Sequence, residues 1–219
     1  MSNQQNSEYG YPLAYKLAGE QLSGLDNIEE RCRKSGARYY RAMDSQKIIF
    51  LKYLNQSYQI FFPDIAISLI ASKEEVPLRD KILILHYLIR ATGAPVTNQL
   101  TAFRELPEGA NYFPTFYKRT IKPLLDHFSR DPEQLLSVAG KLGGHRVDYG
   151  DVAITINAFS YVPITLVLWR SDEEFSPEGS VLFDSTISDY LPTEDIIILC
   201  QTIIWKLVGY LRGIKDRTE

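Results

Sequence analysis

The sequence predicts an α+β fold in which a mainly antiparallel sheet packs against segregated helices as a single domain. Strand and helix patterns fall in separate blocks along the chain instead of alternating, which favours α+β over α/β. Hydrophobic residues fill 45% of the 219 positions. A chain of this length buries about 70% of its unfolded surface, so one core needs no metal or disulfide. We expect a flexible N-terminus over residues 1–12 and one α+β domain over residues 13–219.

Helices are predicted where apolar residues recur every three to four positions. This pattern covers residues 13–35, with a break at Gly24 and a stop at Gly36. Pro77 and Gly93 bracket the most clearly bounded helix, because proline suits a helix start and glycine suits the position after its end. A further helix is predicted to begin near Pro114, with Asn111 as its cap and a kink at Pro123. Two more helices are predicted over residues 131–143 and 191–214.

Strands are predicted from β-branched and aromatic runs bounded by turn residues. Residues 47–53 and 57–62 are two such runs with three residues between them, which indicates a hairpin. Residues 152–158 alternate apolar and polar side chains, as a half-exposed antiparallel strand does. Residues 164–169 are apolar on both faces and are expected at the centre of the sheet. Shorter strands are expected at residues 65–71 and 181–184.

Charge and cysteine content narrow the range of partners. Twenty-four basic and 27 acidic residues give a net charge of −3, so no positive field gathers phosphate backbones and we expect no nucleic-acid partner. The apolar runs stop short of the roughly 20 residues of a membrane span, and the polar first residues lack a signal-peptide pattern. Cys32 and Cys200 stand in no metal-ligand spacing, so we expect reduced thiols and no iron–sulfur cluster. These features predict a cytoplasmic protein without a membrane partner.

The best candidate ligand site is the segment 103–119, which holds Arg104, Glu105 and Tyr112. No catalytic residue is predicted, because the chain contains no GxGxxG, HExxH or GxSxG pattern. The planar fork of an arginine suits a carboxylate or phosphate, Glu105 could hold that fork in place, and tyrosine adds a flat face with a polar tip. Alternatively, Arg104 and Glu105 pair with local backbone and the tyrosines simply pack.

His145 is a second candidate for ligand contact. It follows Gly143 and Gly144 in a predicted tight turn. A mobile glycine turn can present an imidazole to a ligand, whereas an ordinary surface turn is the alternative.

Three carboxylates form a candidate metal site. Asp172 and Glu173 follow the buried strand 164–169, and Asp184 ends the next strand along the chain. If those strands pair, the carboxylates could meet at one end of the sheet, where oxygen ligands suit magnesium or calcium. A solvated acidic loop is the alternative.

Several longer motifs resemble a known family. The runs FRELPEG, NYFPTF, VPITLVLWRSDEEF, VLFD and YLPTED are similar to a family described only as a domain of unknown function, found chiefly in anaerobic bacteria and archaea. Some members of that family also carry a four-cysteine iron–sulfur module similar to one on corrinoid iron–sulfur proteins, which this chain lacks. The resemblance implies work beside anaerobic redox or one-carbon chemistry, with a redox or corrinoid protein as partner, and it implies no activity.

Three functions follow as hypotheses. The first is a cytosolic accessory protein that binds an anionic small molecule or cofactor, such as a tetrapyrrole, through residues 103–119. The second is a divalent-metal-dependent enzyme that uses the three carboxylates, with His145 as proton carrier. The third is a protein-interaction module. A shared concave site for Arg104, Tyr112, His145 and the Asp172 loop would favour the first two, and scattered positions would favour the third.

Overall fold

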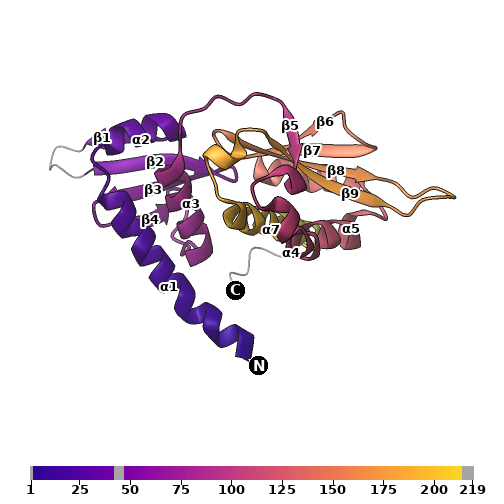
Figure 1. The fold of residues 1–219 in the computed structure, drawn as a ribbon, viewed down its shortest axis with the longest axis horizontal. Helices are drawn as coiled ribbons and strands as arrows, with labels where there is room; N and C mark the ends of the chain where they lie inside the picture. Colours follow the sequence, from indigo (N-terminus) through magenta and orange to yellow (C-terminus); the bar gives the residue numbers. More distant parts are fainter. Residues whose placement is uncertain (1, 42–46, 214–219) are drawn as a thin grey trace. The chain divides into compact units, whose positions relative to one another are not determined.

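The computed structural model describes residues 2–41 and 47–213, which form two compact units. The first unit runs to Ala94 and includes Asp189–Leu191, and the second holds Pro95–Ser188 and continues from Pro192. Each unit has its own antiparallel sheet beside its own helices (Figure 1). The predicted α+β class with antiparallel pairing is therefore confirmed, with two sheets where the sequence suggested one. A single domain over residues 13–219 stays a prediction.

The first unit begins with two helices separated at the predicted break. Helix α1 (Ser2–Ser23) ends just before Gly24, and α2 (Ile28–Ser35) ends at Gly36, whose φ of 69° and N–H bond to the Arg33 carbonyl close the helix. Helix α1 includes residues 2–12, and the flexibility expected of them stays a prediction. The helix runs through Pro12, which removes only one backbone donor and lies on an exposed stretch where water can take the freed carbonyl.

The sheet of the first unit has the order β1-β2-β3-β4. The predicted hairpin is confirmed as β2 (Lys47–Tyr53) and β3 (Gln56–Phe62). Leu54 and Asn55 join them with φ values of 47° and 63°, which are the positive values that a two-residue type I′ turn requires. The remaining elements are β4 (Ala66–Leu69), the unpredicted edge strand β1 (Arg38–Arg41), and helix α3 (Leu78–Arg90).

Alternate residues of β2 and β3 build the core of the first unit. Ile49 and Ile60 are fully buried and lie opposite each other in the register, so one face of the sheet is covered. Helix α3 brings Tyr87 into this core, where its hydroxyl donates to the Ser35 carbonyl at 2.7 Å. The ring of Tyr87 stacks on Tyr190 with 5.6 Å between centroids, which ties the returning residues 189–191 to this unit.

The sheet of the second unit has the order β5-β9-β8-β7-β6. Strand β8 (Val162–Trp169) is central and almost wholly buried, as its apolar sequence predicts, and it pairs with β7 (Val152–Phe159) and β9 (Glu178–Asp184). The edge strands β5 (Leu100–Ala102) and β6 (His145–Val147) have three residues each and were not predicted.

Helices of the second unit lie on one side of this sheet (Figure 1). Helix α4 (Gly109–Phe116) begins at Gly109, so Asn111 is an internal residue and the prediction that it caps the helix is wrong. A π-helical turn (Tyr117–Ile121) precedes α5 (Lys122–Phe128), and the missing donor of Pro123 accounts for this predicted irregularity. The other bounds are α6 (Glu133–Ala139), α7 (Thr193–Leu211) and the 3-10 turns Phe103–Glu105, Gly140–Leu142 and Ile187–Asp189. Across residues 2–41 and 47–213, no helix has the length and apolar character needed to span a membrane.

Candidate functional site

The segment 103–119 is a compact turn built around a glycine. A Cβ atom on Gly109 would lie 1.9 Å from the Phe103 carbonyl oxygen, so only glycine allows α4 to start this close to the preceding 3-10 turn. The rings of Phe103 and Phe116 stack with 3.9 Å between centroids and are both fully buried. From α7, the Thr193 hydroxyl donates to the Pro107 carbonyl at 2.7 Å. The segment is thus held as a rigid part of the second unit.

Arg104 lies on the outside of this turn, above an aromatic ring. The central carbon of its guanidinium lies 3.6 Å from the centroid of Phe113, which is a close cation–π stack. The side chain is exposed, and no carboxylate in the described part of the chain is within ion-pair distance of it. The guanidinium is held flat while its N–H donors stay available. Phe113 was not predicted as a site residue, because nothing in the sequence shows that residue 113 lies under residue 104.

The sequence suggested that Glu105 holds Arg104 in place, but the structure gives Glu105 other partners. Its carboxylate accepts hydrogen bonds from the Ala102 N–H at 2.7 Å and the Thr101 hydroxyl at 3.0 Å, and these bonds lower its pKa. Glu105 therefore closes the start of its own 3-10 turn. The Phe113 ring, and not Glu105, positions the Arg104 guanidinium.

Tyr112 lies on the same helix turn as Phe113 but uses its hydroxyl internally. A hydrogen bond to the Glu194 carboxylate of α7 raises the pKa of the Tyr112 phenol, and the charges of Glu194 and Glu108 act in the same direction. Its hydroxyl is therefore engaged, and its half-exposed ring is the part that a ligand could contact. Glu194 was not predicted as a neighbour of this segment.

His145 lies far from Arg104 across the sheet. The predicted turn lies directly before it, at Gly143 with φ of 70°, and His145 itself is exposed in β6, where it pairs with Thr155. Arg104 follows β5, and β5 and β6 are opposite edges of the five-stranded sheet. Four strand spacings of about 4.8 Å put about 19 Å between those edges. His145 and Arg104 do not share one site.

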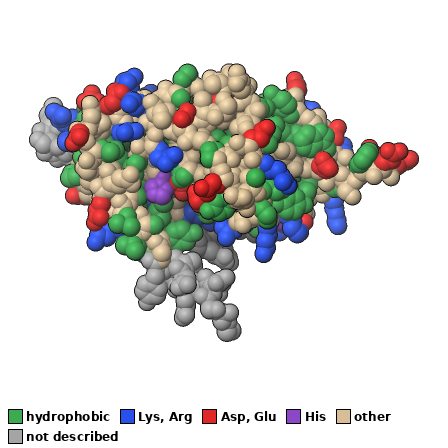
Figure 2. Space-filling view, viewed as in Figure 1, with side chains coloured by type: hydrophobic (Ala, Val, Ile, Leu, Met, Phe, Trp, Pro, Cys, Tyr) green, Lys and Arg blue, Asp and Glu red, His purple; other side chains and the backbone are tan. Residues whose placement is uncertain are grey.

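The three predicted metal ligands do not meet. Strands β8 and β9 form an antiparallel hairpin in which Trp169 pairs with Glu178. Asp172 and Glu173 lie in the loop of this hairpin. Asp184 ends β9, six residues after Glu178, and so lies at the opposite end of the sheet. At about 3.3 Å per residue, it is roughly 20 Å from the loop. Figure 2 shows acidic side chains at the protruding tip of the hairpin. In the described residues, no group of three His, Cys, Asp or Glu side chains could hold a metal ion.

Asp184 has a structural role. It is 1% exposed, and its carboxylate accepts bonds from the backbone N–H groups of Thr97, Asn98 and Thr186 at 3.0, 2.7 and 3.1 Å. The hydroxyls of Thr97 and Thr186 donate to it as well. Burial alone would raise the pKa of Asp184, but these hydrogen bonds outweigh it and lower the pKa. This carboxylate fastens the chain before β5 to the end of β9.

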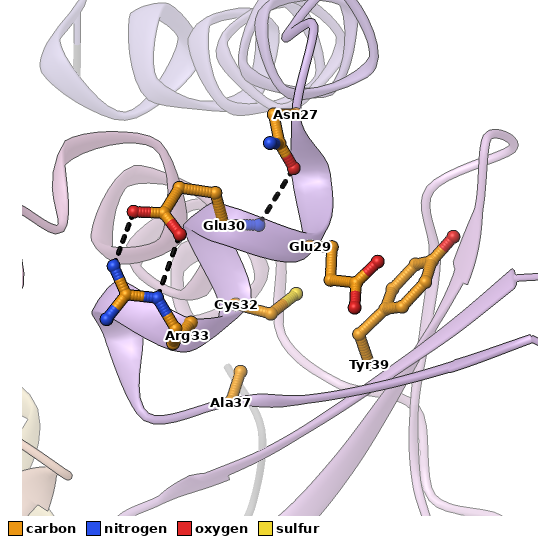
Figure 3. A pocket seen from close by; sticks show the side chains of 7 residues that line it. All are labelled: Asn27, Glu29, Glu30, Cys32, Arg33, Ala37 and Tyr39. Atoms are coloured by element: carbon orange, nitrogen blue, oxygen red, sulfur yellow. Dashed lines mark hydrogen bonds and ion pairs between the residues drawn. The ribbon is translucent and has the colours of Figure 1, made fainter.

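A hollow of about 460 Å³ lies in the first unit, in a place the sequence did not indicate. Glu29 and Cys32 of α2 line one side, and Ala37 and Tyr39 line the other, with Tyr39 in β1 (Figure 3). Burial, assisted by the charge of Glu29, raises the pKa of the Cys32 thiol to about 12. The thiol beside this hollow is therefore neutral and is not a nucleophile at ordinary pH.

Both cysteines are free thiols, as predicted, and the structure buries both of them. Because burial raises both thiol pKa values, we expect neither Cys32 nor Cys200 of the folded protein to react with iodoacetamide within an hour at pH 8. Mass spectrometry should show two modifications after unfolding in urea. Rapid labelling of Cys32 in the folded state would show that the hollow opens around a reactive thiol.

The two units define an α+β protein with one antiparallel sheet in each unit and a surface arginine stacked on phenylalanine. The chain belongs to the family described as Domain of unknown function (DUF3786), which it matches over residues 27–205. The match spans parts of both units and covers the segment 103–119. No curated protein and no solved structure matches the chain.

Proposed function

We propose that the protein is an accessory binding protein in which Arg104 receives an anionic group, a carboxylate or a phosphate, of a small molecule or cofactor. The observation that supports this proposal is the guanidinium held 3.6 Å above the Phe113 ring without a carboxylate partner in residues 2–41 and 47–213. A stacked arginine loses little further freedom on binding, and its planar fork matches two oxygens of one anion.

The neighbouring rings indicate the kind of molecule that carries the anion. Tyr117 is 43% exposed, and its ring centroid lies 6.2 Å from that of Phe113. The half-exposed ring of Tyr112 adjoins Phe113 in α4. A flat, partly aromatic ligand with a carboxylate at its rim, such as a tetrapyrrole, would place its anion on Arg104 and its ring system against these side chains. The Glu194 carboxylate disfavours a second anion beside Tyr112.

A protein-interaction module is the second candidate function. The observation that favours it is that Arg104, His145 and the Asp172 loop lie at separate places on the second unit. Separate exposed groups suit a broad partner surface better than one enclosed substrate. The carboxylate cluster required for the metal-dependent enzyme does not form, because Asp172 and Asp184 lie at opposite ends of the sheet.

The metabolic setting is also part of the proposal. We propose that the protein acts in the cytoplasm in anaerobic metabolism, beside a redox or corrinoid protein. The support for this setting is the resemblance of the segments FRELPEG and VPITLVLWRSDEEF to a family of anaerobic organisms. A fold by itself carries no activity, so the ligand and the partner have to be identified by experiment.

Arg104→Lys is expected to weaken anion binding by about 1 to 3 kcal/mol with little change in melting temperature, because lysine keeps the charge but loses the planar fork. NMR titrations with inorganic phosphate and with citrate would measure the affinity, and thermal unfolding would measure stability. Arg119→Lys is the matched control, since Arg119 is also exposed and stacks on no aromatic ring within residues 2–41 and 47–213.

Lower stability with unchanged affinity in Arg104→Lys would show that the arginine only supports the turn. Native mass spectrometry of protein purified anaerobically from its own host would then distinguish the two candidate functions. A retained small mass that the Arg104→Lys variant loses would support the ligand, and a retained protein subunit would support the interaction module.

A further inference from the structure

Strand β1 is an edge of the first sheet and has helix α2 beside it. The sheet order places only β2 next to β1. The hollow of about 460 Å³ lies between α2 and β1 (Figure 3). An edge strand with a helix alongside and a hollow between them is the arrangement by which proteins bind extended peptides as an added strand.

The backbone of β1 has hydrogen-bonding groups that face away from the sheet. Ala37 turns its N–H away from β2 and donates it to the Cys32 carbonyl at 2.9 Å. Successive residues of a strand alternate in direction, so Tyr39 and Arg41 also turn their N–H and C=O groups away from β2. In residues 2–41 and 47–213, no backbone group bonds to these outward groups. They are free to pair with another chain.

The hollow beside these groups has one carboxylate without a partner. Arg33 holds both oxygens of Glu30, at 2.6 and 2.8 Å, so Glu30 is already neutralised. Glu29 is exposed and makes no hydrogen bond or ion pair with any described residue. The Cys32 thiol and the Ala37 methyl add a small, uncharged surface, and the Tyr39 ring forms one wall.

We propose that β1 and α2 bind an extended segment of a partner protein, which adds as a strand to β1 and places a lysine side chain in the hollow. The residue that pairs with Tyr39 has its side chain on the same face of the sheet as Tyr39, and the hollow lies on that face. A lysine there covers Ala37 and Cys32 with its methylene stem and brings its ammonium group to Glu29. Charge complementarity with Glu29 therefore selects the occupant. This site is separate from Arg104 and does not rest on the function proposed for it.

The test uses the full chain and seven-residue capped peptides of sequence TVTXTVT, in which X is lysine, glutamine or glutamate. Amide NMR titration would give the affinity and the place of binding. We expect the lysine peptide to shift the Tyr39 and Arg41 amides and to bind at least fivefold more tightly than the glutamine peptide. The glutamate peptide should bind still more weakly. N-methylation of the lysine amide should abolish binding, whereas N-methylation of the next amide, which faces away from β1, should leave it unchanged.

Glu29→Gln should bring the affinity for the lysine peptide down to that for the glutamine peptide. Glu75→Gln is the matched control, because Glu75 is 88% exposed and outside the hollow, and it should leave the lysine preference intact. Amide shifts away from β1, or equal affinity for the three peptides, would overturn the proposal. A concentration-dependent dimer in sedimentation that Glu29→Gln does not alter, with shifts at Tyr39, would also overturn it by making a second copy of the chain the occupant.

Discussion

Gly109→Ala is expected to lower the free energy of unfolding by about 3 kcal/mol, because the new methyl group collides with backbone. The Cβ atom would lie 1.9 Å from the Phe103 carbonyl oxygen and 3.0 Å from the carbonyl carbon. A flexible side chain could move aside, but this carbonyl belongs to the 3-10 turn that carries Arg104. The start of α4 or that turn must shift, and the stack of Phe103 on Phe116 must loosen with it.

Urea unfolding followed by circular dichroism would measure this loss of stability. Gly140→Ala is the matched control, because a Cβ atom on Gly140 meets nothing within 4 Å and its backbone is right-handed helical. That substitution should be neutral or stabilise by up to about 1 kcal/mol. Equal stability of Gly109→Ala and the wild type would mean that the turn adapts easily, and the rigid position assigned to Arg104 would lose its basis.

Local patterns predicted the longer elements of this fold. The run at 47–53 became β2, and the breaks at Gly24 and Gly36 became the ends of α1 and α2, because alternation and glycine positions are properties of neighbouring residues. Strands β1, β5 and β6 were missed because they have three or four residues and, unlike β4, lie in no longer apolar run. Such short strands form because a neighbouring strand pairs with them, and their own residues do not predict that pairing.

The candidate site was predicted less well, since it depends on contacts between distant residues. Arg104 was chosen for its chemistry, but its platform Phe113 and the acid Glu194 that binds Tyr112 come together only when the chain folds. The prediction that Asp172 and Asp184 lie close together failed for a different reason. When two consecutive strands pair antiparallel, the end of the first strand lies beside the start of the second, and this rule already separates the two carboxylates.

Asp184→Asn is expected to lower the free energy of unfolding by about 3 kcal/mol at pH 7, since a buried acceptor for several donors loses its charge and gains an amide N–H₂ group. The backbone N–H groups of Thr97, Asn98 and Thr186 all point at this carboxylate, and an amide oxygen cannot satisfy them together. Asp172→Asn is the control. Asp172 also accepts two backbone bonds, at 2.9 and 2.7 Å, but it is exposed in a loop where water replaces them, so the loss should stay below about 1 kcal/mol.

The stabilisation that Asp184 provides should decrease as the pH falls. Hydrogen bonds lower the pKa of Asp184 in the folded state, and an unfolded aspartate has a pKa of about 3.9. The folded state therefore holds its proton less tightly, so the stabilising contribution of Asp184 is complete above the unfolded pKa and is lost as the pH falls through the lower folded value. The wild type should lose its advantage over Asp184→Asn between about pH 4 and the acid limit of folding. Urea unfolding of both proteins at pH 7, 5, 4 and 3 would measure this gap, and a gap that stayed constant down to pH 3 would show that the charge of Asp184 contributes nothing to its anchoring role.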